Sequence, residues 1–202
     1  MKIEYLHASV FGNGAMVAEE FKKRMAARGV TVTVHHIREV GPKELPPADL
    51  YLFSSPGRCG KPIGAMRRFL KKVRLRAGTK YALLTTELAP QPGKRTGRVP
   101  TDEEIAKWQR VRPIMNEVLQ GKGLVEVAEG KVLVTGLKGP LEEGWQKKVE
   151  TFVARIPNPA PMRSANRLRV SESWADQVMH PESRLSGSDA RPTHCHGVHT
   201  DG

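Results

Sequence analysis

Hydrophobic positions along most of the chain follow two spacings in turn, that of a β-strand and that of an amphipathic helix. The run KIEYLHA near the start predicts a short strand. Val17, Phe21 and Met25 then recur at every fourth position, on one face of a helix expected over about residues 13–28, and Gly29 ends it. Because strand and helix patterns keep alternating, the sequence predicts an α/β domain.

Three further apolar runs differ in their pattern, and the difference separates an edge strand from central strands. VTVTVHHI alternates strictly along its length, whereas LYLFS and YALLT are continuously apolar. Alternation is typical of a strand with one open face, and continuous runs are typical of strands buried on both faces. We therefore expect VTVTVHHI at the periphery of a parallel sheet, with His35 and His36 on opposite faces and neither in catalysis. The two continuous runs belong at its centre.

Further helices and a last strand complete the pattern. KPIGAMRRFLKKVR predicts a helix between the two central strands. After a long Pro- and Gly-rich loop, Thr101 and Glu104 form a capping-box pattern that starts one long helix. The residues that this helix is expected to turn toward the core are Ile105, Trp108, Val111, Met115, Val118 and Leu119. LVEVA and KVLVTG predict a last strand split at Glu129 and Gly130, and PLEEGWQKKVETFVARI predicts the closing helix, with Trp145 in the core.

The composition changes at residue 157, where three prolines in five residues end the last helix. Residues 157–202 have few large apolar side chains, so they cannot bury enough surface to offset the entropy of ordering. We expect one domain over residues 1–156 and a largely disordered, low-complexity extension over 157–202. The extension contains THCHGVH, whose metal-ligand atoms have no fixed scaffold and are expected to be adventitious.

The charge of the chain is strongly basic, at +12. Residues 157–202 hold five arginines and five acidic residues, so the whole excess lies in residues 1–156. A field of this size attracts acidic proteins, phosphorylated ligands or nucleic acid, and it does not choose among them.

The cellular compartment is expected to be the cytoplasm, with no membrane partner. MKIEYLHAS carries charges too early and an apolar run too short for a signal peptide, and no run approaches the roughly 18 apolar residues of a spanning helix. Cys59 and Cys195 are far apart and form no CxxC motif, so neither a disulfide framework nor a thiolate zinc site is indicated.

Residues that could bind a ligand follow the carboxyl ends of the predicted strands. Ligands of open parallel sheets bind at those ends, where the strand order reverses. Three loops are expected there, Ser9–Gly14, Ser54–Gly60 and 85–97. In the first loop, Gly12 and Gly14 let backbone amides approach an oxyanion, and the following helix start adds unpaired N–H groups. The loop therefore predicts a phosphate site; the alternative is a tight turn without a ligand.

SVFGNG in the first loop, DLYLFSSP with the proline and MRRFLKK that follow, and the closing GKVLVTGLKGPLEEGWQKKVETFVARI together resemble the flavodoxin family over about residues 1–156. The resemblance implies a three-layer α/β sandwich around a five-stranded parallel sheet of order 2-1-3-4-5. It also implies flavin mononucleotide (FMN), bound by its phosphate in the first loop and by its ring between the other two, and electron transfer with a redox partner protein. The residues that it assigns to the cofactor are Ser9, Val10, Phe11, Gly12, Asn13, Gly14, Ser55, Pro56, Gly57, Arg58, Cys59, Gly60, Thr85, Thr86, Glu87 and Leu88.

Two features depart from that family. Flavodoxins usually have Ser or Thr at the first, third and last positions of the phosphate hexapeptide, where this chain has Ser9, Phe11 and Gly14. Each missing hydroxyl removes a hydrogen bond of about 0.5–1.5 kcal/mol, so weaker phosphate binding is expected. The second and third loops also lack Trp, Tyr and Phe, which leaves Arg58 as the planar side chain for the flavin ring.

Other functions stay open. A flavodoxin-like domain without flavin would be a basic binding module for an acidic protein or, less favoured, nucleic acid. An FMN-dependent oxidoreductase would take hydride from a reduced nicotinamide donor. Gly12-x-Gly14 also matches part of a dinucleotide fingerprint, although Val17 stands at the third glycine position. Cys59 is either a redox thiol or a small loop residue.

The loop that carries Lys94, Arg95 and Arg98 has two interpretations. It is either a solvated loop or a contact for an acidic redox partner or for the phosphates of a nicotinamide donor. Together with Arg58, these charges are expected to make a bound flavin easier to reduce than in an acidic flavodoxin.

Overall fold

The structure is a computed structural model that describes residues 1–93, 95 and 97–157. Its sheet has five parallel strands in the order β2-β1-β3-β6-β7. The strands are β1 (Lys2–His7), β2 (Thr31–His36), β3 (Leu50–Ser54), β6 (Lys80–Leu88) and β7 (Val125–Val134). Since β6 and β7 are the fourth and fifth strands of this sheet along the chain, the predicted order 2-1-3-4-5 is confirmed. The edge position of β2 is confirmed as well. The extension predicted beyond Pro157 lies outside the described residues.

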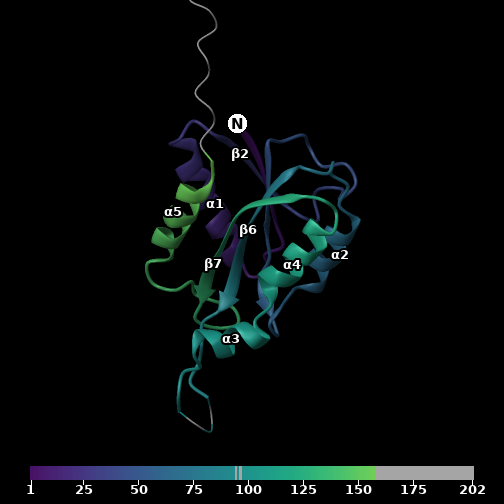
Figure 1. Ribbon diagram of the computed structural model, residues 1–202. Coiled ribbons are helices and arrows are strands. Elements are labelled where there is room, and N and C mark those ends of the chain that lie inside the picture. Colours follow the sequence, from purple (N-terminus) through teal and green to yellow (C-terminus); the bar gives the residue numbers. More distant parts are fainter. Residues whose placement is uncertain (94, 96, 158–202) are drawn as a thin grey trace, which may run out of the picture. The chain divides into compact units, whose positions relative to one another are not determined.

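Helices cover both faces of the sheet and make the predicted three layers (Figure 1). One face carries α1 (Asn13–Ala26) and α5 (Trp145–Arg155), and the other carries α2 (Gly64–Lys72) and α4 (Val111–Gln120). A short helix, α3 (Asp102–Trp108), lies past the carboxyl end of β6 (Figure 1).

Each face has its own hydrophobic core. Successive strand residues point to opposite faces, so β6 gives Ala82 and Leu84 to the core under α1 and α5, and Tyr81 and Leu83 to the core under α2 and α4. Trp145 packs against the first core, as expected.

The single long helix predicted after Thr101 is in fact two helices. The capping box is present, because Thr101 Oγ1 accepts from the Glu104 amide at 3.3 Å and Glu104 Oε2 accepts from the Thr101 amide at 2.8 Å. The helix nevertheless ends at Trp108, since Pro113 has no N–H to donate to Gln109 and instead suits the first turn of α4. Trp108, expected in the core, is 49% exposed.

The last strand runs unbroken through Glu129 and Gly130, which corrects the predicted split. A Cβ on Gly130 would lie 2.8 Å from Phe152 Cδ2 and 3.3 Å from Leu84 Cδ1. The glycine therefore admits the ring of Phe152 on α5 to the sheet surface. A glycine inside a strand pattern often marks a close approach of another part of the chain rather than the end of the strand.

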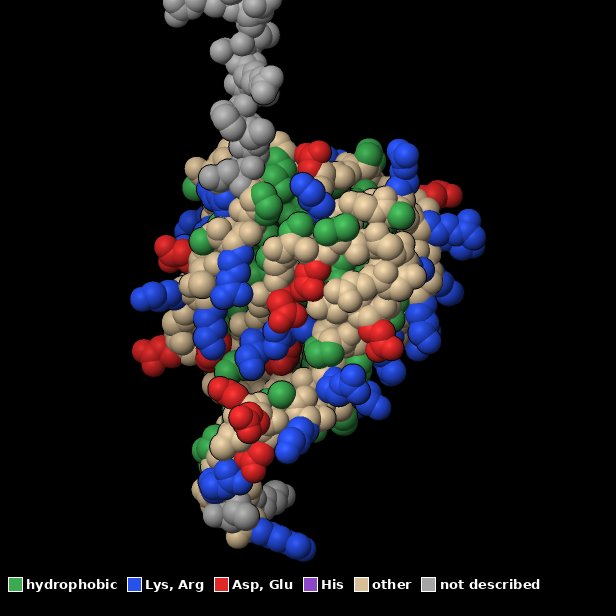
Figure 2. All heavy atoms as spheres, in the orientation of Figure 1, with side chains coloured by type: hydrophobic (Ala, Val, Ile, Leu, Met, Phe, Trp, Pro, Cys, Tyr) green, Lys and Arg blue, Asp and Glu red, His purple; other side chains and the backbone are tan. Residues whose placement is uncertain are grey.

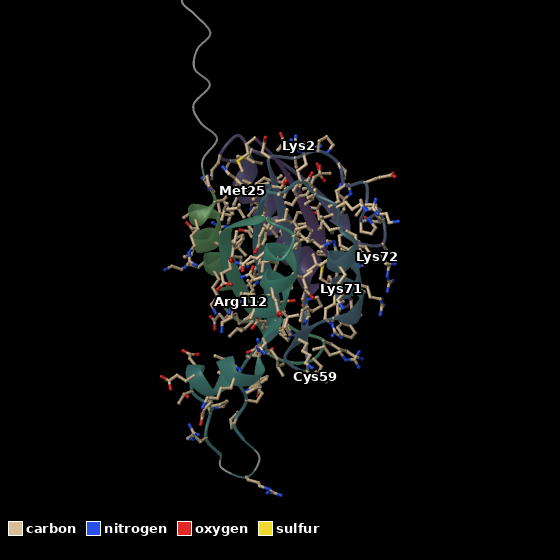
Figure 3. The ribbon with its side chains drawn as sticks, turned by 45° about the vertical axis from the view of Figure 1, so that its right-hand side comes forward. Lys2, Met25, Cys59, Lys71, Lys72 and Arg112 are labelled. Carbon is tan, nitrogen blue, oxygen red and sulfur yellow. The ribbon has the colours of Figure 1, made fainter. Side chains whose placement is uncertain are left out.

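A small hairpin that the sequence pattern did not predict follows β3. Its strands, β4 (Gly57–Arg58) and β5 (Lys61–Pro62), pair antiparallel. Cys59 and Gly60 make the turn with φ angles of 49° and 70°, and positive φ at both central residues is typical of a type I′ turn. Cys59 is exposed at this turn, at the end of the molecule where α3 lies (Figure 3).

The two histidines at the end of β2 lie on opposite faces of the sheet, as predicted. His35 Nε2 is 2.9 Å from Glu4 Oε2 on β1, and the ring of His36 stands edge-on to His7 with centroids 5.2 Å apart. Glu4 and His7 are three positions apart on β1 and so face opposite ways.

Among the described residues, no helix combines the length and the apolarity that crossing a membrane requires. In that same part of the chain, no three His, Cys, Asp or Glu side chains are grouped so that they could hold a metal ion. The THCHGVH motif lies outside the described residues.

We expect Gly130→Ala to destabilise the fold by about 1–3 kcal/mol, because the added methyl group overpacks the contact with Phe152. Gly41→Ala is the matched control, since a Cβ on the exposed Gly41 would meet no atom within 4 Å and should change stability by less than about 0.5 kcal/mol. Urea unfolding followed by circular dichroism measures both, and equal stabilities for the two variants would contradict this account of Gly130.

Candidate functional site at the carboxyl end of the sheet

Hydrogen bonds join the three predicted loop segments at one end of the sheet. The Ala8 amide donates to the Ser54 carbonyl at 3.0 Å, which joins the end of β1 to the end of β3. The Thr86 amide donates to the Ser55 carbonyl at 3.2 Å, and Pro56 forms a bridge with Thr86. The segments that follow β1, β3 and β6 are therefore neighbours in space.

The loop between β1 and α1 leaves a run of backbone amides unused. Of the amides from Ser9 to Ala15, that of Ser9 donates to His7 Nδ1 at 3.3 Å and that of Gly14 donates to Ser9 Oγ at 3.1 Å. Among the described residues, no partner exists for the other five, at positions 10–13 and 15. Unpaired N–H groups at the start of a helix are suited to hold an anion, and the helix dipole adds to their attraction.

Two glycines allow this loop to close tightly. Gly12 has φ 85°, a left-handed conformation, and it immediately precedes α1. A Cβ on Gly14 would lie 3.1 Å from Ser9 Cβ and 3.3 Å from Ser9 Oγ, so the glycine lets the start of the helix pack closely on Ser9. The Ser9 hydroxyl accepts from Gly14 and keeps its own proton to donate outward.

A fourth segment, which the sequence analysis does not predict, lies against the Ser9–Gly14 loop. Asn13 Nδ2 donates to the Lys138 carbonyl at 3.0 Å, and a Cβ on Gly139 would lie 2.8 Å from the Asn13 side chain. The connection between β7 and α5 therefore borders the same end of the sheet. The long sequence separation left no local signal for this contact.

The second loop is partly closed upon itself. Ser55 is fully buried, and its hydroxyl donates to the Pro56 carbonyl at 3.0 Å and accepts from the Ile63 amide at 3.3 Å. Gly60 packs on the break between α3 and α4: a Cβ there would lie 2.0 Å from the Trp108 carbonyl oxygen, and its own carbonyl accepts from the Arg110 amide at 2.7 Å. Of the predicted residues in this loop, Arg58 and Cys59 are exposed.

The side chains of Thr85 and Glu87 turn into the interior beneath α4. Thr85 Oγ1 donates to Glu87 Oε1 at 2.7 Å, and Arg112 Nε lies 3.3 Å from that same oxygen. Both residues are at most 2% exposed. They share the strand face of Tyr81 and Leu83, so their side chains serve packing and only their backbone can meet a ligand here.

Arg112 extends this buried cluster to the next strand. Its Nη1 lies 2.8 Å from Glu129 Oε1 on β7, and Asn116 Oδ1 accepts from the Tyr81 hydroxyl at 2.8 Å. Burial raises the pKa of Tyr81 to about 12. The cluster ties α4 to β6 and β7, as Figure 3 illustrates with Arg112 beside α4.

In the basic loop, Lys94 lies outside the described residues. Arg98 Nη1 and Nη2 donate to the two carboxylate oxygens of Glu104 at 3.1 and 2.7 Å. The Arg98 hydrogen bonds and the Thr101 amide lower the pKa of Glu104 to about 2. The Arg98 charge is therefore offset by a carboxylate in α3, which weakens the expectation that it acts on a flavin.

Two aromatic side chains near this end of the sheet are exposed. Phe11 in the first loop is 56% exposed, and Trp108 projects from α3 next to the second loop. The family resemblance assigns Phe11 to the cofactor, whereas the sequence pattern predicts Trp108 in the core and so misses its exposure. Pro113 was the available signal that the helix would break beside Trp108.

His7 links the sheet to the first loop. It is only 8% exposed, its Nδ1 accepts from the Ser9 amide, and His36 lies against its ring. Burial, and then the nearby His36, lower the pKa of His7 below its ordinary value of 6.5. A neutral His7 keeps Nδ1 free to accept the Ser9 N–H.

Comparison with known proteins identifies the fold of this chain. No family model and no curated protein matches the chain. Among solved structures, flavodoxin 2 from Bacillus cereus is 20% identical, with TM-score 0.55 over 77% of this chain and 97% of its own. Flavodoxin 1 from the same organism is 18% identical, with TM-score 0.55 and coverage of 77% and 96%.

Rubredoxin oxygen:oxidoreductase from Desulfovibrio gigas is 12% identical, with TM-score 0.55 over 77% of this chain. The chain spans only 35% of that longer protein. Likeness at these identities establishes a flavodoxin-like fold and leaves function to the residues of the site.

We expect Arg112→Met to destabilise the fold by about 3 kcal/mol, because it leaves the buried Glu87 carboxylate without its cation. Adding Glu87→Gln should recover part of that loss by removing the unpaired charge. Arg110→Met is the control, because the Arg110 side chain is exposed. Urea unfolding measures all variants, and equal losses for Arg112→Met and Arg110→Met would refute this role of Arg112.

Stability should fall as the pH falls below about 6.5, because the unfolded chain then protonates His7 while the folded chain resists it. His7→Asn keeps an acceptor for the Ser9 amide and cannot titrate, so its unfolding free energy should depend less on pH in this range. Urea titrations at matched pH values compare the two proteins, with His36→Asn as control for the neighbouring ring. An unchanged pH dependence in His7→Asn would rule out His7 as its source.

Proposed function

We propose that this chain, which has a flavodoxin-like fold, binds FMN through its phosphate at the Ser9–Gly14 loop and acts in electron transfer with a redox partner protein. One observation carries the proposal: the five amides of this loop and the start of α1 that have no partner among the described residues. A dianionic phosphate is the part of FMN that such a run of donors would hold.

The residues present fit a phosphate despite the two absent hydroxyls. Backbone amides remain as donors whatever the side chains are, and the Ser9 hydroxyl has a proton to add. Gly14 packs closely on Ser9, and the Ser9 hydroxyl accepts from its amide, so the geometry of the loop is set before any ligand arrives. Phe11 and Gly14 therefore reduce the expected affinity without removing the site.

The flavin ring would lie between the second and third segments. Here Pro56 and Gly57 are partly exposed, Arg58 and Cys59 are exposed, and the backbone of Thr86 and Leu88 borders the same end of the sheet. When bound, the flavin supplies the exchange of electrons, and the protein supplies binding, orientation and charge.

Exposed aromatic and basic side chains near this end would complete the site. Phe11 and Trp108 offer apolar faces that the second and third loops lack. Arg58 offers a positive charge, and among the described residues it is in no ion pair. A positive charge near the ring favours the reduced, more negative flavin.

An acidic surface on the redox partner and a location in the cytoplasm belong to the same proposal, and both rest on the basic charge and sequence features of the chain. The candidate acid and base side chains near the site, Glu87 and His7, are buried and bound to neighbours. This favours electron transfer over acid–base chemistry on a second substrate.

The test is the visible absorbance of the purified chain before and after incubation with excess FMN and removal of the unbound flavin. We expect retained flavin bands and an affinity for FMN at least about tenfold above that for riboflavin, because riboflavin lacks the phosphate. Val10→Asp, which puts a carboxylate among the unpaired amides, should weaken FMN about tenfold and leave riboflavin unchanged.

Val125→Asp is the matched control. It introduces the same charge at an exposed position at the start of β7, at the end of the sheet away from the candidate site. A chain that retains no flavin would overturn the proposal and favour a flavin-free binding module. Equal affinities for FMN and riboflavin would remove the phosphate role from the Ser9–Gly14 loop.

A further inference from the structure

The basic charge of the chain is concentrated in one continuous segment. Residues 50–86 contain nine Lys and Arg residues and no Asp or Glu. They are Arg58, Lys61, Arg67, Arg68, Lys71, Lys72, Arg74, Arg76 and Lys80. This segment has a net charge of +9, compared with +12 for the whole chain.

Helix α2 displays the centre of this segment to solvent. Arg67, Arg68, Lys71 and Lys72 are exposed, while Met66, Phe69 and Leu70 are buried in the core. Among the described residues, none of the nine side chains forms an ion pair. Figure 2 shows Lys and Arg outnumbering Asp and Glu along the flank formed by α2, and Figure 3 places Lys71 and Lys72 there.

A groove of about 360 Å³ runs between α2 and α4 beside these charges. Its residues are Gly64, Arg67, Arg68, Lys71, Ile114 and Val118. Ile114 and Val118 are four positions apart on α4 and so lie next to each other along one face of that helix. The basic side chains come from α2, so the groove has an apolar wall and a basic wall.

We propose that this groove, defined by its α2 cations and by Ile114 and Val118, is a docking site for an acidic amphipathic helix of a partner protein. A helix that lays an apolar stripe on Ile114 and Val118 would bring its flanking Asp and Glu side chains to Arg67, Arg68 and Lys71. Gly64 at the end of the groove has no side chain to obstruct it.

An acidic peptide suits this surface better than nucleic acid does. A single strand of nucleic acid would stack its bases on aromatic side chains, and the groove residues include none. Phe69, the aromatic residue of α2, is buried. The two partly buried aliphatic side chains of α4 have no use in phosphate binding but suit a groove that receives the apolar face of a helix.

The groove begins close to the second loop of the candidate cofactor site. The Arg67 amide donates to the Ile63 carbonyl at 3.1 Å, and the Ile63 amide donates to Ser55 Oγ at 3.3 Å. A partner docked on α2 would therefore sit one helical turn from that loop. Binding at the groove is nonetheless independent of FMN, so it is tested apart from the proposed function.

The test is fluorescence anisotropy of a labelled peptide of about 14 residues, four helical turns, with leucines at i and i+4 spacing and glutamates around them. The probe is titrated with the full chain, both with FMN added and without. We expect binding in about the micromolar range that weakens at least about tenfold between roughly 50 and 300 mM salt. A scrambled peptide of the same composition should bind more weakly.

Two variants locate the site. Arg67→Glu/Lys71→Glu should weaken the peptide at least about tenfold, and Val118→Thr, which keeps the side-chain shape, should weaken it about threefold. The matched control is Lys22→Glu/Lys23→Glu, which makes the same charge change at exposed positions of α1 on the other face of the sheet. Thermal unfolding checks that each variant is folded.

Three results would overturn the proposal. They are absence of peptide binding, equal binding of the scrambled peptide, and equal weakening by the α1 control. Tighter binding of a single-stranded oligonucleotide of matched charge, unaffected by Val118→Thr, would reassign the surface to a phosphate backbone. Binding by the flavin-free chain that follows the expected pattern would support the groove even if FMN binding fails.

Discussion

The contact between Arg112 and Glu87 ties α4 to the sheet beside the candidate site. Glu87, one residue before the end of β6, is a buried carboxylate, and a buried carboxylate needs a cation beside it. Arg112 supplies that cation from the first turn of α4 and reaches Glu129 on β7 as well. With α4 fixed in this way, the Arg110 amide can hold Gly60 in the second loop, and Ile114 faces the groove beside α2. This ion pair thus helps to position both the second loop and the basic groove.

Sheet order and layer arrangement were predictable because they depend on patterns that repeat along the chain. Continuous and alternating apolar runs separated inner strands from the edge strand, and the family resemblance supplied the order that the structure confirms. Helix and strand interruptions were predicted less well, because Gly and Pro each have more than one use. Gly130 makes room for a ring where a split in the strand was expected, and Pro113 lies in the first turn of a second helix where one long helix was expected.

In the candidate site, the positions of the loops were predictable and the directions of the side chains were not. Strand order alone brings the three loops to one end of the sheet, and the glycines of the first loop indicate its close turn. Side-chain direction depends on tertiary partners that no local pattern reveals: Thr85 and Glu87 face Arg112, Arg98 faces Glu104, and Asn13 binds the backbone of a residue far along the chain. The exposure of Trp108 follows from the break between α3 and α4, so a prediction of one long helix also places Trp108 in the core.

Helix α3 is attached to the rest of the domain by few buried residues. Between Thr101 and Arg110, only Ile105 and Gln109 are buried, and the ion pair between Arg98 and Glu104 is exposed to solvent. Segments with so few buried contacts unfold locally at a small fraction of the global free energy. We therefore expect α3 to open locally at a lower free energy than the sheet beside it.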